Sequence, residues 1–470
     1  MAVEWLQRNI GEQIMASASA KRRIWGWWCF DWASQPYSTL LLTFIFGPYF
    51  AQVARDHYTT QGMDTAAAGA AAQSLWGAGL AICSFAVALL APFLGAVADA
   101  AGRRLVWIWA FSGLYVLGAC GLWALMPTGD GLLLTLGFFG LGFIGMEFAT
   151  IFTNALLPAL GPRDEIGAIS GSGFAFGYLG GVVALALMLL FFAENAQTGR
   201  TLIGLSPAFG LDATLREGTR AVGPFTALWY AVFMVPFFLW VQEPKTPRQT
   251  GALRAALSRL WALITGLRRR PSLAQFLVAS LVYRDALNAL YGFGGIYAVG
   301  VLGWSVVEVG SFGVIGALAA AAASWMGGRA DRRFGPKPVI IVAIVALIAV
   351  CCIILGLDRR GLFTLTWPAG SALPDQIFYL CGALIGGAGG ALQSASRTMM
   401  VRHTSLASAT EAFGLYALSG RVTSFLAPAL ITAATMASGS QRWGMVPLVV
   451  LFLGGLALMA RVSPEGEAAP

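Results

Sequence analysis

The amino-acid sequence predicts an all-α membrane protein in which twelve transmembrane helices form two pseudo-symmetric six-helix bundles. Three observations indicate this fold: the composition, the number and length of the apolar spans, and a loop sequence that occurs twice. Apolar residues other than glycine make up 57% of the 470 residues and charged residues only 11%, whereas soluble domains contain about 25% charged residues. A chain with so few charges cannot cover a surface that faces water, so lipid must be its main solvent.

Twelve apolar spans have the length of a membrane helix, which is about 20 residues. Two of them carry internal charges: Gly131–Leu157 contains Glu147, and Ser272–Val299 contains Arg284 and Asp285. Helices are expected because isolated short strands cannot satisfy their backbone hydrogen bonds in lipid. The ten charge-free spans are Trp32–Ala54, Thr65–Ala98, Leu105–Gly129, Ile166–Ala193, Ala221–Gln242, Val309–Gly328, Pro338–Leu357, Gln376–Ser396, Val422–Gln441 and Trp443–Ala460.

The positions of the basic residues predict the orientation. The net charge of +8 does not indicate a nucleic-acid partner, because the basic residues lie in short segments between apolar spans rather than on one soluble face. Most of them lie in segments that become cytoplasmic if the N-terminus is inside. Both termini are therefore expected in the cytoplasm, and a bacterial inner membrane is the expected location.

A basic segment divides the chain into two halves. Residues 1–242 form the first half, residues 243–271 a cytoplasmic linker, and residues 272–470 the second half. Within the linker, leucine and isoleucine recur at helical spacing from Leu253 to Leu267, beside several arginines. This pattern is typical of an amphipathic helix on the membrane surface; a flexible basic tether is the alternative. The long polar segment Glu194–Arg220 is expected outside.

One loop sequence follows the second helix of each half: GAVADAAGRR at Gly95–Arg104 and GGRADRRFGPK at Gly327–Lys337. Two copies at corresponding positions indicate a parallel duplication. Glycine permits a tight turn and close helix ends, and aspartate can accept hydrogen bonds from a neighbouring helix N-terminus. Ordinary basic turns would explain the arginines but not the paired glycines and aspartates. The predicted gating residues are Gly95, Asp99, Gly102, Arg103, Gly327, Asp331, Arg332 and Gly335.

The doubled loop resembles the signature of the major facilitator superfamily, and further segments resemble its vacuole-effluxer-like subfamily, which includes the autophagy-related amino-acid effluxers of fungi. The segments are WCFDWASQPYSTLLLTFIFGPYF (28–50), FTNALLP (152–158), ISGSGFAFGYLGG (169–181), YRDALN (283–288), GGALQSASR (389–397) and EAFGLYALSGRVTSFLAP (411–428). The resemblance implies the major facilitator fold, with helices one, four, seven and ten around a central cavity, and efflux of amino acids or similar small metabolites. Gln35-Pro36 and Ala286 depart from the family pattern.

Polar residues within the spans are the candidates for substrate contact, because charges inside a membrane are costly and usually face a cavity. Arg284 and Asp285 are adjacent on helix seven and point about 100° apart, so they cannot pair along one face. Structural pairing with neighbouring helices is the alternative for both. The predicted substrate-binding residues are Arg284, Asp285, Asn288, Gln393, Arg397, Asn154 and Gln35.

Two carboxylates are candidates for proton coupling. Glu147 lies deep in helix four, and Asp31 lies near the inner end of helix one. A carboxylate in a low dielectric holds its proton more tightly, which suits a proton carrier near neutral pH. A packed hydrogen-bonded acid is the alternative for Glu147, and a helix-start carboxylate for Asp31. Arg421 is expected to pair with an acid.

These features predict a secondary active transporter rather than an enzyme. A G-x-x-x-x-G-K loop, an H-E-x-x-H motif and a G-x-S-x-G motif are all missing from the sequence, so we expect no cofactor, no metal and no ATP-driven step. The six cysteines lie in apolar spans without metal-ligand spacing, and His57 and His403 are expected in solvated loops. The expected partners are a small-molecule substrate, protons and lipid, with the chain a monomer. A transporter of another organic anion or zwitterion, or a non-transporting sensor, is the alternative.

Overall fold

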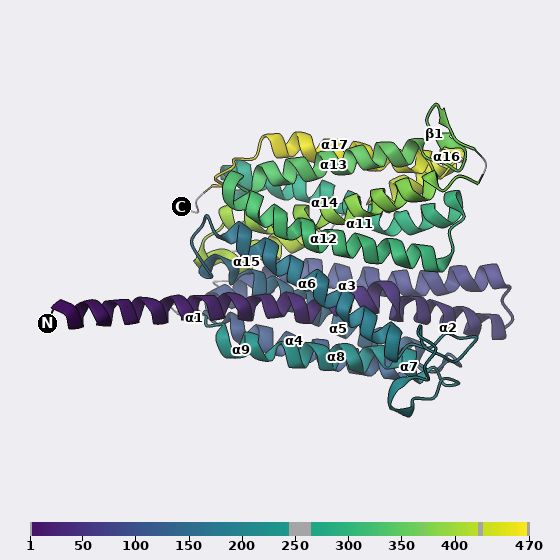
Figure 1. The fold of residues 1–470 in the computed structure, drawn as a ribbon, viewed down its shortest axis with the longest axis horizontal. Coiled ribbons are helices and arrows are strands. Elements are labelled where there is room, and N and C mark those ends of the chain that lie inside the picture. The colour runs from purple at the N-terminus through teal and green to yellow at the C-terminus, as the bar shows by residue number, and fades with distance from the viewer. Residues whose placement is uncertain (1, 244–264, 369, 422–425, 468–470) are drawn as a thin grey trace.

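The computed structural model describes residues 2–243, 265–368, 370–421 and 426–467, and most of them are helical (Figure 1). The expected all-α fold is confirmed. The described residues form only one small sheet, in which β1 (Gly361–Leu362) pairs antiparallel with β2 (Leu365–Thr366). This hairpin lies in the connection between two helices of the second half, so it does not interrupt the bundle.

The first half contains the helices from α1 to α9. Its first membrane span is composite: α1 is followed by a π-helical segment, η1, which begins directly after Pro36. A proline disturbs the helical hydrogen-bond ladder, which accounts for the change of helix type there. The elements are α1 (Ala2–Pro36), η1 (Tyr37–Phe44), α2 (Phe46–Thr60), α3 (Thr65–Ala101), α4 (Arg104–Gly121), α5 (Leu132–Asn154), α6 (Ile166–Phe191), α7 (Glu217–Arg220), α8 (Val222–Phe233) and α9 (Val235–Trp240).

The second half contains the helices from α11 to α17. Ser305 begins α12 with a capping box, in which its side chain accepts from the backbone of Glu308 while the Glu308 carboxylate accepts from the backbone of Ser305. The elements are α11 (Pro271–Leu302), α12 (Val306–Phe334), α13 (Pro336–Gly356), α14 (Leu373–Arg402), α15 (Ala409–Ser419), α16 (Leu426–Ser438) and α17 (Val446–Ala460).

The number of membrane helices is consistent with the expected twelve. Among the described residues, ten helical stretches are long and apolar enough to cross a membrane. The charged helix α11, with 32 residues, and the pair α15 and α16 occupy the two remaining positions. The amphipathic helix expected in the linker falls mostly on residues 244–264, which lie outside the described part of the chain.

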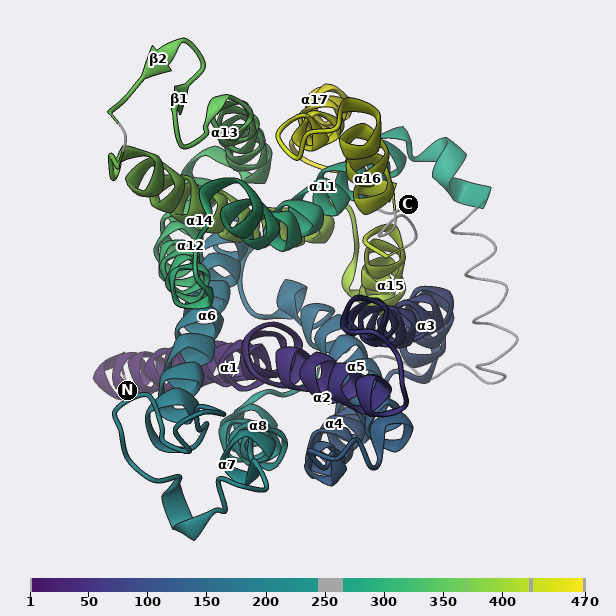
Figure 2. The same cartoon turned by 90° about the vertical axis from the view of Figure 1, so that its right-hand side faces the viewer.

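The two halves lie side by side, with α1–α9 in one bundle and α11–α17 in the other (Figures 1 and 2). They touch where α6 packs on α12 and where α3 packs on α15. Glycines allow both contacts: a Cβ on Gly171 would lie 2.6 Å from the Cα of Gly328, and a Cβ on Gly95 would lie 2.6 Å from the carbonyl oxygen of Thr410. We call the end of the bundle that holds the two repeated loops the inner end, and the opposite end the outer end.

Candidate functional site

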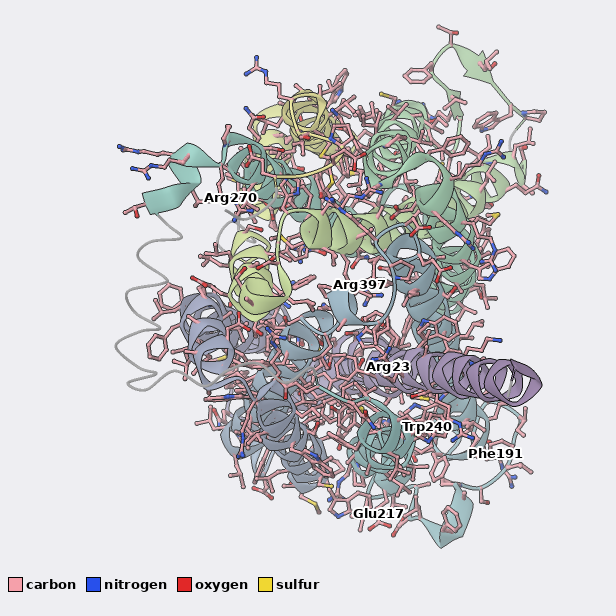
Figure 3. All side chains as sticks on the ribbon, turned by 90° about the vertical axis from the view of Figure 1, so that its left-hand side faces the viewer. Arg23, Phe191, Glu217, Trp240, Arg270 and Arg397 are labelled. Carbon is pink, nitrogen blue, oxygen red and sulfur yellow. The ribbon has the colours of Figure 1, made fainter. Side chains whose placement is uncertain are left out.

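Arg397 of α14 joins the two halves near the inner end, where it lies between them (Figure 3). Its guanidinium donates to Asp31 of α1 at 3.2 Å, to the Asn154 side chain of α5 at 3.1 Å, and to the Ser170 hydroxyl of α6 at 2.9 Å. A further bond reaches the Ser170 carbonyl at 2.8 Å. Four helices, three of them from the opposite half, therefore meet at one side chain, which we call the Arg397 cluster (Asp31, Asn154, Ser170 and Arg397).

The Arg397 cluster is buried, and its charges balance. Arg397 is only 3% exposed; its guanidinium lies 4.5 Å from the ring centre of Trp27 and 4.2 Å from that of Phe174, so aromatic faces add cation–π attraction. Gly173 makes room for Asp31, because a Cβ there would lie 2.6 Å from the carboxylate. Breaking one member of such a buried pair is costly, since it leaves an uncompensated charge.

A second ion pair joins the halves near the middle of the bundle. Arg421 pairs with Glu147 of α5, and the Arg421 guanidinium lies 3.5 Å from the Ser84 hydroxyl of α3. The side chains of Arg421 and Glu147 are 28% and 16% exposed, so this pair is more open than the Arg397 cluster. Arg421 thus pairs with an acid, as expected, and that acid is one of the two predicted proton carriers.

Neutral polar side chains lie one to two helical turns outward of Arg397. The Gln393 amide donates to the Tyr178 hydroxyl of α6 at 3.2 Å. Asn288 and Tyr291 are exposed on one face of α11, and Tyr291 is 41% exposed. The Tyr291 hydroxyl packs closely on Gly389 of α14, where a side chain larger than hydrogen would collide with it. An aromatic residue that is solvent-accessible between helices of both halves is typical of a cavity lining.

Sequence reasoning selected Asn288 and Gln393 but missed Tyr178 and Tyr291. A signal existed for Tyr291, which lies three residues after the selected Asn288 on the same helix, whereas Tyr178 has no selected residue one turn away on its helix. Gln35, another predicted contact, is half-buried on α1 against α6, where a Cβ on Gly181 would lie 2.9 Å from its side chain.

Arg284 and Asp285 point to different neighbours, and the structure does not bring them together. Arg284 donates to the Tyr416 carbonyl at 3.0 Å and lies 4.2 Å from the centre of that ring. Asp285 is 3% exposed and accepts a hydrogen bond from the backbone N–H of Ala427, in the first turn of α16, at 3.0 Å. Asp285 is therefore turned towards α16, whereas Arg284 is turned towards α15, because adjacent helical residues face different directions.

The first repeated loop holds α3 to the start of α15. Asp99 accepts from the Thr410 hydroxyl at 2.6 Å and from the backbone N–H of Glu411 at 2.9 Å, and it pairs with Arg104 at 2.7 Å. The predicted contact between the aspartate and a helix N-terminus is present. The arginine that pairs is the buried Arg104, whereas the predicted Arg103 is exposed, because Gly102 (φ 62°) turns the chain between the two helices.

The second repeated loop lies against the start of α6. Asp331 is 2% exposed, and a Cβ added to Gly167 of α6 would lie 2.4 Å from the carboxylate carbon of Asp331. Arg332 pairs with Glu165 at 3.6 Å on the surface. Gly335 has a φ of 81° at the turn into α13, as a tight turn requires. Gly327 packs on Ala391 of α14 in the same half, and its neighbour Gly328 makes the contact with α6.

The chain end adds a third connection at the inner end. We call residues 463–467 the tail. The Glu467 carboxylate accepts from the backbone N–H groups of Ser272 and Leu273, which begin α11, at 2.9 and 3.3 Å, where a helix N-terminus favours an anion. Arg163, in the first half, donates to the carbonyl oxygen of Glu465. The tail therefore connects α11 of the second half with the loop before α6.

His403 was expected in solvent, and that expectation is wrong. It is fully buried under the tail, stacked on Phe276 with ring centres 5.5 Å apart. Its Nδ1 faces the Met399 carbonyl at 2.9 Å and must donate, so its Nε2 accepts from the Ser272 hydroxyl at 2.9 Å. Ser272 in turn accepts from the backbone N–H of Ser463 at 2.8 Å. Burial lowers the pKa of His403, which keeps the imidazole neutral.

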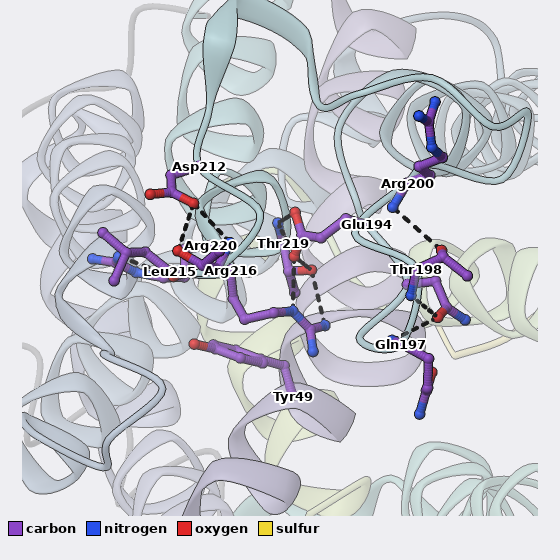
Figure 4. A network of polar contacts seen from close by, with 12 residues as sticks. Tyr49, Glu194, Gln197, Thr198, Arg200, Asp212, Leu215, Arg216, Thr219 and Arg220 are labelled. Carbon is purple, nitrogen blue, oxygen red and sulfur yellow. Dashed lines mark hydrogen bonds and ion pairs between the residues drawn. The ribbon is translucent and has the colours of Figure 1, made fainter.

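The long outer segment folds around a buried carboxylate (Figure 4). Glu194 accepts from Arg216 at 2.8 Å and from the Thr219 hydroxyl at 2.7 Å. Arg220 donates to the Trp123 carbonyl at 2.6 Å and lies over the Trp123 ring, while Arg216 lies over Tyr49. This network belongs to the first half alone, so the segment caps the outer end of that bundle.

Polar contacts between the halves define the conformation. The polar contacts that join the halves include Arg421–Glu147 and Gln393–Tyr178 near the middle of the bundle, and the contacts of Arg397, Asp99 and Arg163 towards the inner end. The structure is therefore closed at the inner end.

Comparison with known proteins identifies the family. The model of the family described as "Vacuole effluxer Atg22 like" matches residues 19–467. An uncharacterized MFS-type transporter of Bacillus subtilis, YxiO, is 26% identical over 448 residues, covering 93% of this chain and 94% of YxiO. Autophagy-related protein 22 of Cryptococcus neoformans is 22% identical over 307 residues, which are 63% of this chain and 50% of the fungal protein.

Solved structures show the same fold. The human organic anion transporter MFSD10 aligns with a TM-score of 0.66 at 17% identity, covering 94% of this chain and 99% of that one. The major facilitator transporter FucP in its outward conformation aligns with a TM-score of 0.63 at 16% identity, covering 94% and 98%. With two helical halves, a repeated inner loop and a family match over almost its whole length, this chain belongs to the Atg22-like vacuole effluxer family and is a membrane transporter of the major facilitator type.

Proposed function

We propose that the protein is a proton-coupled secondary transporter that exports amino acids or similar small polar metabolites by alternating access. The observation that carries the proposal is the pair of carboxylate–arginine contacts between the halves, Asp31–Arg397 and Glu147–Arg421. Each contact places a titratable group of one half on a fixed cation of the other. A proton on either carboxylate removes one charge of the pair, so proton binding and the separation of the halves are linked.

The substrate would bind between the middle of the bundle and the Arg397 cluster. Arg284 has no carboxylate partner among the described residues, since its guanidinium is held by the Tyr416 carbonyl and ring. A substrate carboxylate would find this cation, and guanidinium–carboxylate bonds are the strong, directional ones. Asn288, Tyr291 and Gln393 would supply neutral hydrogen bonds, and Glu147 would attract an ammonium group.

The remaining predicted contacts keep narrower roles in this proposal. Asn154 and Arg397 are occupied by one another and by Asp31 while the inner end is closed, so they become available to substrate only when the inner end opens. Gln35 is half-buried between α1 and α6 and would contact substrate near Asn154 and Arg397. The repeated loops, with Asp99 and Asp331, would hold the inner end closed.

A transporter of organic anions is the second candidate, and the charge of the cavity favours it. Arg284, Arg397 and Arg421 contribute three cations, of which only two have a carboxylate partner in the described structure. An anion without an ammonium group would satisfy Arg284 equally well. In both cases the protein acts as a monomer in a bacterial inner membrane with both termini in the cytoplasm, and it requires no metal, cofactor or enzymatic step.

The test is transport by purified protein in liposomes. A panel of labelled amino acids and organic anions is offered with and without an imposed pH gradient. Gradient-dependent movement of amino acids is expected in the wild type. Glu147→Gln should retain exchange of substrate and lose the response to the gradient, whereas the surface variant Arg55→Lys, as the matched control, should behave as wild type. Transport of anions alone would select the second candidate, and transport of neither class would refute the proposal.

A further inference from the structure

Asp285 is a membrane carboxylate that the structure buries without a cation. It is 3% exposed, and its Oδ2 accepts from the backbone N–H of Ala427 at 3.0 Å. Its Oδ1 is buried and has no hydrogen-bond partner in the described structure. The other two acids that lie deep in the spans, Asp31 and Glu147, are each bonded to an arginine. Asp285 therefore differs from them in its electrostatic surroundings.

Among the residues that the structure describes, the groups around Asp285 do not supply a counter-charge. Arg284, on the same helix, is directed to the Tyr416 carbonyl and ring of α15. Tyr283 is directed to the Ser396 hydroxyl of α14. The buried charge of α14, Arg397, is bonded to Asp31 of the other half, and the described residues of α16 and α17 contain no titratable side chain.

The other neighbours of α11 carry their charges at the helix ends. Glu308 lies in the first turn of α12, and Asp331 near its last turn. Asp375 and Arg402 lie in the first and last turns of α14. These groups belong to the two ends of the bundle, whereas Asp285 lies near the middle of the 32-residue helix α11.

An ionised carboxylate is disfavoured in this environment. Taking a charge out of water is expensive unless a partner charge and several hydrogen bonds replace the water. The N-terminus of α16 supplies one N–H bond and a partial positive charge, which satisfies one oxygen and leaves the other without a donor. Protonation removes the charge and leaves the bond from Ala427 in place.

We propose that Asp285 is a proton-binding group of the transporter and that it holds its proton in this inner-closed conformation, while Asp31 and Glu147 are ionised. The inference rests on the proposed function, because it assigns one step of proton coupling to a residue that the sequence selected for substrate binding. Loss of the proton leaves a carboxylate at the start of α16, and the charge strengthens its attraction to that helix N-terminus. Proton binding at Asp285 thus changes how firmly α16 is held to α11.

The first experiment detects the proton directly. Infrared difference spectra of the purified protein in lipid nanodiscs record the C=O stretching band of protonated carboxyl groups, which shifts in D2O. Part of this band is expected to persist at neutral pH in the wild type and in Glu147→Gln, the matched control, and to be missing in Asp285→Asn. Asparagine keeps the acceptor for Ala427, so folding should be preserved. If Asp285→Asn is not folded, Asp285→Glu should retain the band at a shifted frequency.

The second experiment separates this inference from the proposed function. In liposomes, Asp285→Asn should exchange substrate like the wild type and lose its response to a pH gradient. An unchanged carboxyl band in Asp285→Asn, or a full gradient response, overturns the assignment of Asp285 even where the wild type is a proton-coupled transporter. A wild type that transports nothing refutes the proposed function, and the infrared result then still decides whether Asp285 holds a proton.

Discussion

The contacts that Arg397 makes between the halves depend on the planar, forked shape of its guanidinium group. Its nitrogens reach Asp31, Asn154 and Ser170 in three different directions while its flat faces lie against Trp27 and Phe174. An ammonium group carries the same charge but cannot make planar, forked contacts or stack on rings in this way. Charge alone therefore does not account for the closed inner end.

Arg397→Lys should shift the protein towards an inner-open conformation. The variant keeps the attraction to Asp31 and loses bonds to Asn154 and Ser170, at a cost of about 1–3 kcal/mol, which is roughly a tenfold to hundredfold change in population. Spin labels at the exposed positions Arg103 and Arg333, one in each half, measure the separation. The control Arg55→Lys should leave the distances unchanged, and unchanged distances in Arg397→Lys would show that the cluster does not hold the halves together.

His403 should make the inner end sensitive to acid. Its pKa is lowered by burial in the folded protein, so the unfolded chain binds the proton more readily. The free energy of unfolding is then fully retained above the ordinary histidine pKa of about 6.5 and falls as the pH decreases below it. Thermal unfolding measured across this range should lose less stability in His403→Gln than in the wild type. His57→Gln, at the outer end, is the control; an equal pH response in all three proteins would contradict the prediction.

Individual site residues could be selected from the sequence, but their partners could not. Asp31, Glu147 and Arg397 stand out because a charge in an apolar span is rare. Which acid meets which arginine depends on how the halves are rotated, and no local pattern records that rotation. The same reason explains why Arg103 was selected in place of Arg104, and why the buried His403 was expected in a loop: each position is set by contacts with residues far away in the sequence.

At the level of helices, close packing at glycines brings the halves together. The four-residue spacing of Gly173, Gly177 and Gly181 predicts a packed face of α6, and in the structure these residues lie against α1 and η1. Another face of the same helix, at Gly167 and Gly171, meets α12. The sequence shows that a glycine-rich helix packs closely, whereas the identity of its neighbours comes only from the three-dimensional arrangement.

Gly171→Val should prevent closure at the inner end. A Cβ at this position would lie 2.4 Å from the carbonyl oxygen of Ser324 and 2.6 Å from the Cα of Gly328, so backbone atoms of α12 would have to move. With the same pair of spin labels, the inner-end distance should increase. Gly137→Val is the control, because no atom lies within 4 Å of a Cβ there. A closed inner end in Gly171→Val would mean that the contact between α6 and α12 is not required.

Removal of the tail should weaken the inner closure without unfolding the protein. A chain that ends at Val462 lacks the Glu467 carboxylate at the start of α11 and the Glu465 carbonyl that Arg163 contacts, while α17 remains complete. Labelling of a cysteine introduced at Ser394, which is buried beside α6, should become faster. Glu465→Ala keeps the carbonyl that Arg163 uses, so it should label like the full-length protein; equal labelling of the truncated chain would exclude a role for the tail.

On the scale of the whole molecule, the sequence predicted the fold better than the site. Apolar length and a repeated loop are local signals, and they were sufficient for two bundles of helices. They were not sufficient for the course of single spans: the first is divided among α1, η1 and α2, and another consists of α15 and α16. Breaks of this kind depend on what the neighbouring helices offer the backbone, as Asp285 does for α16.

The topology can be tested with reporter fusions. A reporter after Glu465 should report the cytoplasm and one after Leu211 the outside, because the basic residues concentrate in the segments near the inner end. The capped outer segment around Glu194 and the tail then lie on opposite sides of the membrane. The same side for both fusions would contradict the odd number of membrane spans expected between Leu211 and Glu465.

The distribution of charge between the halves has a consequence for biogenesis. In both ion pairs that join the halves deep in the bundle, the acid belongs to the first half, as Asp31 or Glu147, and the arginine to the second, as Arg397 or Arg421. The ribosome makes the first half earlier, so two carboxylates enter the membrane before their cations exist. Newly made chains must keep these acids protonated or in contact with water until Arg397 and Arg421 have been made, and the final docking of the halves then neutralises both acids.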